Sequence, residues 1–212
     1  MALVAFDFDG TLTDDEMTVV LGEQADVADE MADITEQAMN DEIEYAASLR
    51  RRVRLLEDLP GDAAKTAFDS IELHDGIPEL LAELETADVT IVVLTGGFER
   101  GVRHILDREG ITVDALVANR LGVADRSLTG EVEGPLVEGT KDVVLRALVT
   151  EFEETFGETA AVGDGANDLP MLQAAGVGIG FRPKSAITDD CDVIVNSVEE
   201  LRDALKENGF LP

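Results

Sequence analysis

The chain has 212 residues, of which 45% are apolar, so it can bury one full core or a core with a modest additional lobe. Acidic residues outnumber basic residues by 46 to 16, and the net charge of −30 excludes binding to nucleic acid or to an anionic membrane over a broad face. No apolar run approaches the roughly 20 residues of a membrane-spanning helix, and the N-terminus lacks the basic region of a secretory signal. A single cysteine, Cys191, excludes an internal disulfide, so we expect a cytoplasmic protein.

The acidic residues are spread along the chain, which argues against a disordered acidic tail. Self-repulsion at this charge should destabilise the compact state in dilute buffer. Molar salt shortens the Debye length to about 3 Å and relieves that repulsion. We therefore interpret the chain as a cytoplasmic protein of a halophile, with an ordinary acidic protein as the alternative.

The first predicted element is a short buried strand over Val4–Phe6. Apolar spacings of three and four residues then predict helices without intervening strands, over Met17–Ala25, Val27–Met39, Glu42–Asp58 and Asp62–Ser70. We expect these helices to form a small all-helical cap, residues 16–72, inserted after the first strand.

From Gly76 onward, apolar strands alternate with helices, which is the pattern of a parallel sheet covered on both faces. The predicted strands are Val89–Thr95, Asp114–Asn119, Thr129–Gly134, Thr159–Gly163, Gly176–Phe181 and Cys191–Val195. The predicted helices are Phe98–Arg108, Thr140–Phe156, Asp168–Ala175 and Val198–Asn208. Residues 1–15 and 73–212 are thus expected to form an α/β, Rossmann-like core.

Four polar motifs stand where predicted strands end or predicted helices begin: Asp7–Thr11, Leu94–Gly97, Lys141 and Gly163–Asp168. In an open α/β sheet, ligands bind outside the carboxyl ends of the strands. If the strands are neighbours in the sheet, all four motifs converge on one point.

The residue types in these motifs suit phosphoryl transfer. Asp7, Asp9 and Asp164 offer hard oxygen ligands, which suit Mg²⁺ better than a His or Cys site would. Donors and positive charge for binding an anion come from Thr95, Gly96 and Lys141. Carboxylates, a divalent ion and an oxyanion cradle together describe phosphoryl transfer, where positioning and charge stabilisation do most of the catalysis.

The two aspartates of the first motif would have different roles. Asp7 would attack phosphorus and form an aspartyl-phosphate. Asp9 would protonate the leaving oxygen and then deprotonate the attacking water. Lys141 would complete the catalytic set by stabilising negative charge beside them.

The motifs Asp7–Thr11, Thr95–Gly97, Lys141 and Gly163–Asp168 resemble the four motifs of the haloacid dehalogenase superfamily. The resemblance extends to its phosphoserine phosphatase family, through a glutamate shortly after the first motif, Glu16, and the segment Ser48–Val53. It implies a Mg²⁺-dependent hydrolase that releases L-serine and phosphate from L-phosphoserine in serine biosynthesis.

The same resemblance implies the residues that bind the substrate. Arg52 would take the substrate carboxylate and Glu16 its ammonium group. Other implied contributions are an apolar wall from Met39 and Tyr45, a phosphate contact from Asn167, and support of the metal ligands by Asp168.

Several alternatives remain open at this point. The substrate could be another small phosphorylated metabolite, or the phosphoryl group could pass to an alcohol instead of water. A non-catalytic phospho-acceptor domain is a more distant alternative, because such domains have one lobe and need no general acid such as Asp9. A binding protein with a decayed site is disfavoured, since no catalytic position is missing. The oligomeric state, monomer or homodimer, is left open.

If the acidic composition is an adaptation to salt, the melting temperature should rise from low to multimolar KCl, because screening weakens repulsion among the carboxylates. Thermal unfolding at fixed pH across a KCl series measures this. A melting temperature that stays level or falls would remove the halophile interpretation.

Overall fold

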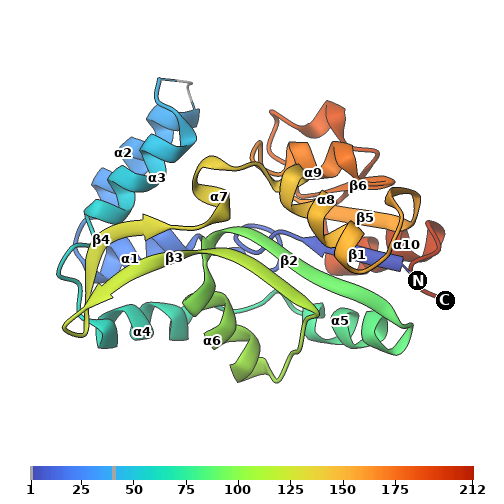
Figure 1. The fold of residues 1–212 in the computed structure, drawn as a ribbon, viewed down its shortest axis with the longest axis horizontal. Coiled ribbons are helices and arrows are strands. Elements are labelled where there is room, and N and C mark those ends of the chain that lie inside the picture. Colours follow the sequence, from blue (N-terminus) through green and yellow to red (C-terminus); the bar gives the residue numbers. More distant parts are fainter. Residues whose placement is uncertain (1, 40–41) are drawn as a thin grey trace.

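The structure, a computed structural model, describes residues 2–39 and 42–212. Its strands form one sheet in the order β4-β3-β2-β1-β5-β6-β7 (Figure 1). The strands are β1 (Ala2–Phe6), β2 (Val89–Phe98), β3 (Ala115–Ala124), β4 (Ser127–Glu133), β5 (Thr159–Gly163), β6 (Val177–Phe181) and β7 (Val193–Val195). The α-helices are α1 (Met17–Gln24), α2 (Ala28–Met39), α3 (Tyr45–Arg54), α4 (Gly61–Ser70), α5 (Ile77–Thr86), α6 (Glu99–Glu109), α7 (Pro135–Glu138), α8 (Lys141–Glu151), α9 (Leu169–Ala174) and α10 (Val198–Glu207).

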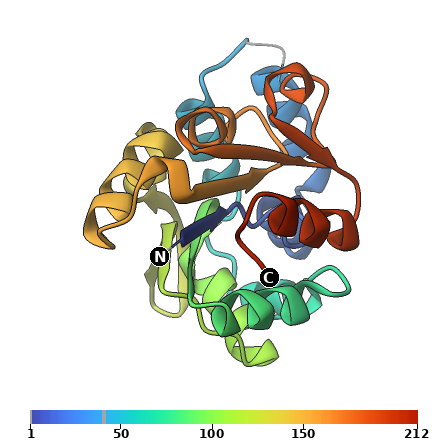
Figure 2. The same cartoon turned by 90° about the vertical axis from the view of Figure 1, so that its right-hand side faces the viewer.

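Strand β1 lies in the middle of the sheet, between β2 and β5, and is parallel to both. Its side chains alternate between the two faces: Leu3 and Ala5 pack with α8 and α9, whereas Val4 and Phe6 pack with α5, α6 and α10. Figure 2 shows helices on both sides of the strands. All four side chains are fully buried, which explains why the first strand is a continuous apolar run. The predicted α/β class is confirmed.

One edge of the sheet departs from the parallel pattern that the sequence predicts. Strand β4 pairs antiparallel with β3 through a two-residue turn at Asp125 and Arg126. Both turn residues have positive φ, 47° and 68°, as a type I′ hairpin requires. The turn contains neither glycine nor asparagine, so the usual sequence signal for this hairpin is missing.

Helices α1 to α4 form a lobe between β1 and α5, where a helical cap is predicted. The β3–β4 hairpin joins this lobe, and in Figure 1 it lies below α2 and α3. The Asp58 N–H donates to the Leu128 carbonyl (2.9 Å), and the Leu128 N–H donates to the Leu59 carbonyl (2.9 Å). The Gly61 N–H donates to the Arg126 carbonyl (2.7 Å). Among its described residues the insert forms helices and no strand, as predicted, and the hairpin of the core packs against it.

Two helices differ from their predicted extents. The helix expected over Thr140–Phe156 ends at Glu151, and Glu153 follows with a positive φ of 58°, which a helix cannot continue through. Helix α5 is not among the predicted elements. Its start is nevertheless marked by Gly76, in the left-handed region at φ 90°, and by a proline in its first turn.

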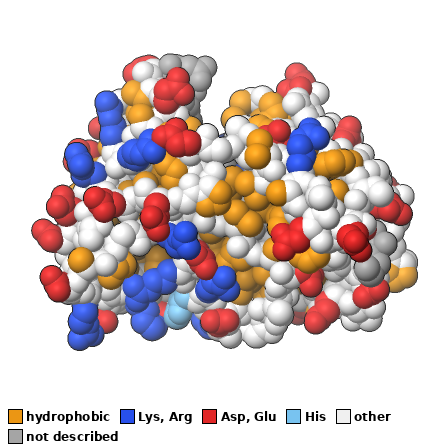
Figure 3. Space-filling view, viewed as in Figure 1, with side chains coloured by type: hydrophobic (Ala, Val, Ile, Leu, Met, Phe, Trp, Pro, Cys, Tyr) orange, Lys and Arg blue, Asp and Glu red, His pale blue; other side chains and the backbone are white. Residues whose placement is uncertain are grey.

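The surface agrees with the composition. Figure 3 shows acidic side chains spread over the visible face, and a hollow between the lobe of α2 and α3 and the part of the core that carries α9. Within residues 2–39 and 42–212, none of the helices has the length and hydropathy needed to cross a membrane. The division into a core of residues 1–15 and 73–212 and a cap of residues 16–72 stays a prediction.

The contact between the lobe and the core depends on a glycine in α6. A Cβ added at Gly101 would lie 2.8 Å from the Phe68 ring of α4 and 2.9 Å from the Met17 sulfur of α1. Gly101→Ala should therefore destabilise the protein by about 1–3 kcal/mol through overpacking. Denaturant unfolding at fixed molar KCl measures the change.

Gly157→Ala is the matched control, because a Cβ there meets nothing within 4 Å, and we expect a change within about 0.5 kcal/mol. Equal unfolding midpoints for the two variants would contradict the role given to Gly101.

Candidate active site

The ammonium group of Lys141 brings three of the four motifs together. Lys141 begins α8, and its side chain is only 3% exposed. Its Nζ lies 2.6 Å from Oδ1 of Asp7, just after β1, and 2.5 Å from Oδ1 of Asp168, just before α9. The motifs therefore do converge at the carboxyl ends of the central strands.

Asp168 braces the loop that follows β5. Its Oδ2 accepts hydrogen bonds from the backbone N–H groups of Asp164 (3.0 Å) and Gly165 (2.9 Å), while its Oδ1 pairs with Lys141. A Cβ at Gly163 would lie 2.5 Å from the Cβ of Asp168, so only glycine fits at the end of β5. Both oxygens of the fully buried Asp168 carboxylate are thus occupied by protein donors.

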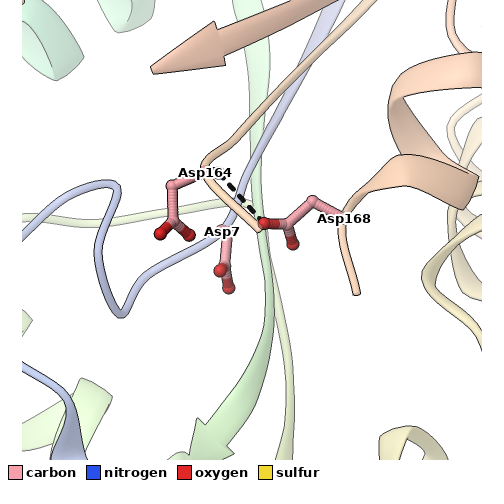
Figure 4. A group of neighbouring side chains, drawn as sticks. All are labelled: Asp7, Asp164 and Asp168. Atoms are coloured by element: carbon pink, nitrogen blue, oxygen red, sulfur yellow. Dashed lines mark hydrogen bonds between the residues drawn. The ribbon is translucent and has the colours of Figure 1, made fainter. Parts of the chain in front are cut away.

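Three buried carboxylates form the best candidate metal centre among the described residues. One oxygen each from Asp7, Asp164 and Asp168 lies within 4.8 Å of the others. Figure 4 shows the Asp7 and Asp164 carboxylates pointing to the same side of the cluster, and Asp168 joined by a hydrogen bond to the Asp164 backbone. Because three protein donors already bind the Asp168 carboxylate, Asp7 and Asp164, each with one ion-paired oxygen, are the side chains more available to a hard cation such as Mg²⁺.

The Asp9 carboxylate, predicted as a metal ligand, lies outside this three-residue group. Its Oδ2 accepts a hydrogen bond from the Met17 N–H (3.2 Å) at the start of α1, so the side chain is turned toward the helical lobe. Its Oδ1 is buried and has no hydrogen-bond partner. The predicted contribution of Asp9 to the metal site stays a prediction, and its position suits a proton-transfer group.

Burial perturbs the proton affinities in the site. The pKa of Asp7 is raised to about 8 by burial and by the nearby charge of Asp168, which together outweigh the attraction of Lys141. Burial, followed by the charges of Glu16 and Asp7, raises the pKa of Asp9 well above its usual range. Burial alone would lower the pKa of Lys141, but Asp168 and Asp7 raise it instead, so the ammonium stays charged.

A close approach between the first and fourth motifs explains Gly10. This residue has a positive φ of 78°, and a Cβ on it would lie 2.6 Å from Oδ2 of Asp164. Any other residue would be strained and would displace the Asp164 carboxylate.

The second motif lies in the last residues of β2, where the pairing with β3 shifts register between Leu94 and Phe98. The Thr95 Oγ1 accepts a hydrogen bond from the Gly97 N–H (2.9 Å). Asn119, on β3, donates to the Gly96 carbonyl (3.0 Å) and accepts from the Leu136 N–H (3.1 Å). Asn119 is fully buried, and the sequence analysis assigns it no role, because a lone polar residue in a strand pattern is a weak signal.

Of the two predicted substrate-binding residues on α3, Tyr45 contacts a core motif and Arg52 contacts helix α1 of the lobe. The Tyr45 hydroxyl lies directly against the open side of Gly96, where a Cβ would collide with it. Arg52 donates through Nη1 to Thr18 Oγ1 (3.1 Å), and its Nε is buried without a partner. A buried donor without a partner is costly, so the Arg52 guanidinium is prepared to bind an anion.

The remaining predicted residues are less enclosed. Glu16 precedes α1 with 45% of its side chain exposed, and Asn167 is exposed in the loop between β5 and α9. The side chain of Met39 lies outside the described residues.

Lys184, in the loop after β6, is a site residue that the sequence analysis does not single out. Its Nζ lies 2.9 Å from Oδ2 of Asp164 and 3.6 Å from Oε1 of Glu16. The one sequence signal is scarcity, since Lys184 is one of few lysines in a chain with 16 basic residues.

Comparison with known proteins agrees with this geometry. The family model described as haloacid dehalogenase-like hydrolase matches residues 4–173. The chain belongs to this family of hydrolases.

Within the family, its relatives are phosphoserine phosphatases. That of Halobacterium salinarum is 49% identical over 210 residues, covering 99% of this chain and 100% of the relative. That of Methanocaldococcus jannaschii is 36% identical over 205 residues, covering 96% of each chain.

Solved structures give the same result. A phospho-aspartyl intermediate analogue of phosphoserine phosphatase has a TM-score of 0.88 and 36% identity, over 97% of this chain and 98% of the other. A substrate-bound phosphoserine phosphatase complex has a TM-score of 0.89 and 35% identity, over 97% of each chain.

The burial of Asp7 should lower the stability of the metal-free protein at high pH and increase the stabilisation that Mg²⁺ provides. Because the pKa of Asp7 in the folded protein is about 8, above its usual 3.8, its contribution to stability is lost as the pH rises through about 8. In EDTA, Asp7→Asn should therefore raise the melting temperature at pH 9, where the wild type holds a buried, ionised carboxylate. With Mg²⁺, the wild type should gain stability and the variant should gain much less.

Melting temperatures between about pH 6 and 9, with EDTA or Mg²⁺ at fixed molar KCl, provide the measurement. Asp203→Asn, at an exposed position of α10, serves as the control for loss of one negative charge. Parallel pH curves for wild type and Asp7→Asn in EDTA would refute the expectation.

Proposed function

We propose that this chain is a Mg²⁺-dependent phosphomonoesterase that converts L-phosphoserine to L-serine and phosphate. The observation that carries the proposal is the buried Asp7 carboxylate at the end of β1, paired with Lys141 and adjacent to Asp164. The Halobacterium salinarum phosphoserine phosphatase, 49% identical over nearly the whole chain, supports the same substrate.

In the first step, an oxygen of Asp7 attacks phosphorus and the bond from phosphorus to the serine oxygen breaks. Asp9 transfers its proton to that oxygen, which its raised pKa permits at neutral pH. Lys141, Thr95 and the Gly96 amide hold the phosphoryl oxygens. Asp7 and Asp164 would hold Mg²⁺, which would supply positive charge to offset the phosphate and the buried carboxylates.

In the second step, Asp9 is a carboxylate and takes a proton from water. The water oxygen bonds to phosphorus, the bond from phosphorus to Asp7 breaks, and phosphate leaves. The lobe of α1 to α4 limits the entry of bulk water, and the Asp9 contact with the Met17 N–H links the proton-transfer group to that lobe. Asp168 keeps Lys141 and the Asp164 loop in position throughout.

Substrate selection comes from the lobe and from the start of α1. The unpaired Nε of Arg52 would bind the serine carboxylate, and Glu16 would bind its ammonium group. Tyr45 would cover the phosphate pocket above Gly96. We also propose that the protein works in the salt-rich cytoplasm of a halophile, in serine biosynthesis.

Phosphate release from L-phosphoserine, phosphothreonine and sugar phosphates, with Mg²⁺ or EDTA in molar KCl, tests the proposal directly. We expect Mg²⁺-dependent release that is fastest with L-phosphoserine, and near-complete loss in Asp7→Asn. Faster release from sugar phosphates than from L-phosphoserine would identify a phosphatase with a different substrate. Phosphate retained on the protein for minutes without release would favour a phospho-acceptor domain. Phosphoryl transfer to added alcohols in preference to water would identify a phosphotransferase.

Arg52→Ala should raise KM for phosphoserine by about ten- to a hundredfold, because a charged hydrogen-bonding partner of the carboxylate is lost. Phosphoethanolamine, which lacks a carboxylate, should show little change in KM. Steady-state kinetics on both substrates measure the difference.

Arg51→Ala is the matched control, since Arg51 is the exposed neighbour on the same helix. Equal losses on both substrates in Arg52→Ala would mean that Arg52 supports the structure of the lobe instead.

A further inference from the structure

The Lys184 ammonium group lies between two carboxylates with different proposed partners. It contacts Asp164 Oδ2 at 2.9 Å and Glu16 Oε1 at 3.6 Å. Among residues 2–39 and 42–212, no other basic side chain forms an ion pair with either carboxylate. Lys141, the other ammonium of the site, is already taken up by Asp7 and Asp168.

Each of these two carboxylates is expected to bind a cation in the working enzyme. Asp164 is available to the divalent ion, and Glu16 is the proposed partner of the substrate ammonium. Both cations carry the same sign as Lys184, and like charges that share one carboxylate repel each other. The ion pair between Lys184 and either carboxylate is therefore weakened once that carboxylate has bound its cation.

Hydrogen bonds hold the backbone of Lys184 in place, whereas its ammonium group is free to change position. The Lys184 N–H donates to the Asp164 carbonyl (2.8 Å), and the Lys184 carbonyl accepts from the Ile187 N–H (3.0 Å). Its side chain is 45% exposed, so the ammonium can turn into solvent at little cost in hydration.

We propose that Lys184 is a positioning residue whose ammonium occupies the places of two external cations: the metal at Asp164 and the substrate ammonium at Glu16. It holds both carboxylates in place while the site is empty, and it yields them when the cations bind. Lys184 thus lowers the affinity for Mg²⁺ and for ammonium-bearing ligands while it keeps the empty site electrostatically balanced. The half of this inference that concerns Glu16 rests on the proposed function, whereas the half that concerns Asp164 does not.

The decisive variant is Lys184→Met, which keeps the length of the side chain and removes its charge. In this variant, Mg²⁺ should bind about two- to fivefold more tightly in the absence of substrate, the range expected for loss of a half-exposed ion pair. Titration calorimetry at fixed KCl measures the affinity. The KM for phosphoserine should fall by a similar factor. The KM for 3-phosphooxypropanoate, which lacks the ammonium group, should not change once Mg²⁺ is saturating.

Two controls separate this role from general charge and from structural support. Lys65→Met removes an ion-paired lysine of α4 outside the site, and it should leave Mg²⁺ binding and both KM values as in the wild type. Lys184→Arg keeps the charge and should restore wild-type affinities. In a Glu16→Gln background, Lys184→Met should no longer lower the KM for phosphoserine.

Weaker or unchanged Mg²⁺ binding in Lys184→Met would overturn the proposal. Such a result is expected of a lysine that supports the structure of the site and does not compete with the metal. An equal change in KM for both substrates would also overturn it. If neither substrate releases phosphate, the proposed function fails, and the calorimetric result still decides whether Lys184 competes with the metal.

Discussion

The site depends on the paired contacts of one buried ammonium group. Lys141 lies at the start of α8, between Asp7 at the end of β1 and Asp168 at the start of α9. Without this charge, two buried carboxylates would repel each other across the carboxyl edge of the sheet, and losing one partner of a buried pair typically costs about 3–5 kcal/mol. Asp168 extends the constraint to the Asp164 and Gly165 amides, so a single network sets the positions of the Asp7 carboxylate and of the loop that follows β5.

The same network leaves the site short of positive charge. Asp7, Asp9 and Asp164 all have raised pKa values because burial disfavours their ionised forms, and the buried Oδ1 of Asp9 has no hydrogen-bond partner. A chain of charge −30 offers few cations to balance them. A divalent ion held by these carboxylates would remove the electrostatic conflict that folding creates.

The core and the lobe contribute different parts of the site. The core supplies Asp7, Lys141 and Asp164 from the ends of strands and the start of a helix. The lobe supplies Arg52 and Tyr45 from one helix, α3, which packs on the hairpin that the core extends toward it. Because the hairpin bonds to the loop between α3 and α4, the position of α3 is coupled to the sheet itself.

The sequence alone determined the α/β class, the helical lobe after the first strand, and the meeting of Asp7, Lys141 and Asp164, because strand ends in a parallel sheet face one edge and apolar periodicity locates the strands. It did not determine the β3–β4 hairpin, whose turn at Asp125 and Arg126 lacks glycine. Nor did it turn the Asp9 carboxylate toward the Met17 N–H or bring Lys184 to Asp164. Those outcomes depend on side-chain direction and on contacts between residues distant in the chain, which only the packed tertiary structure decides.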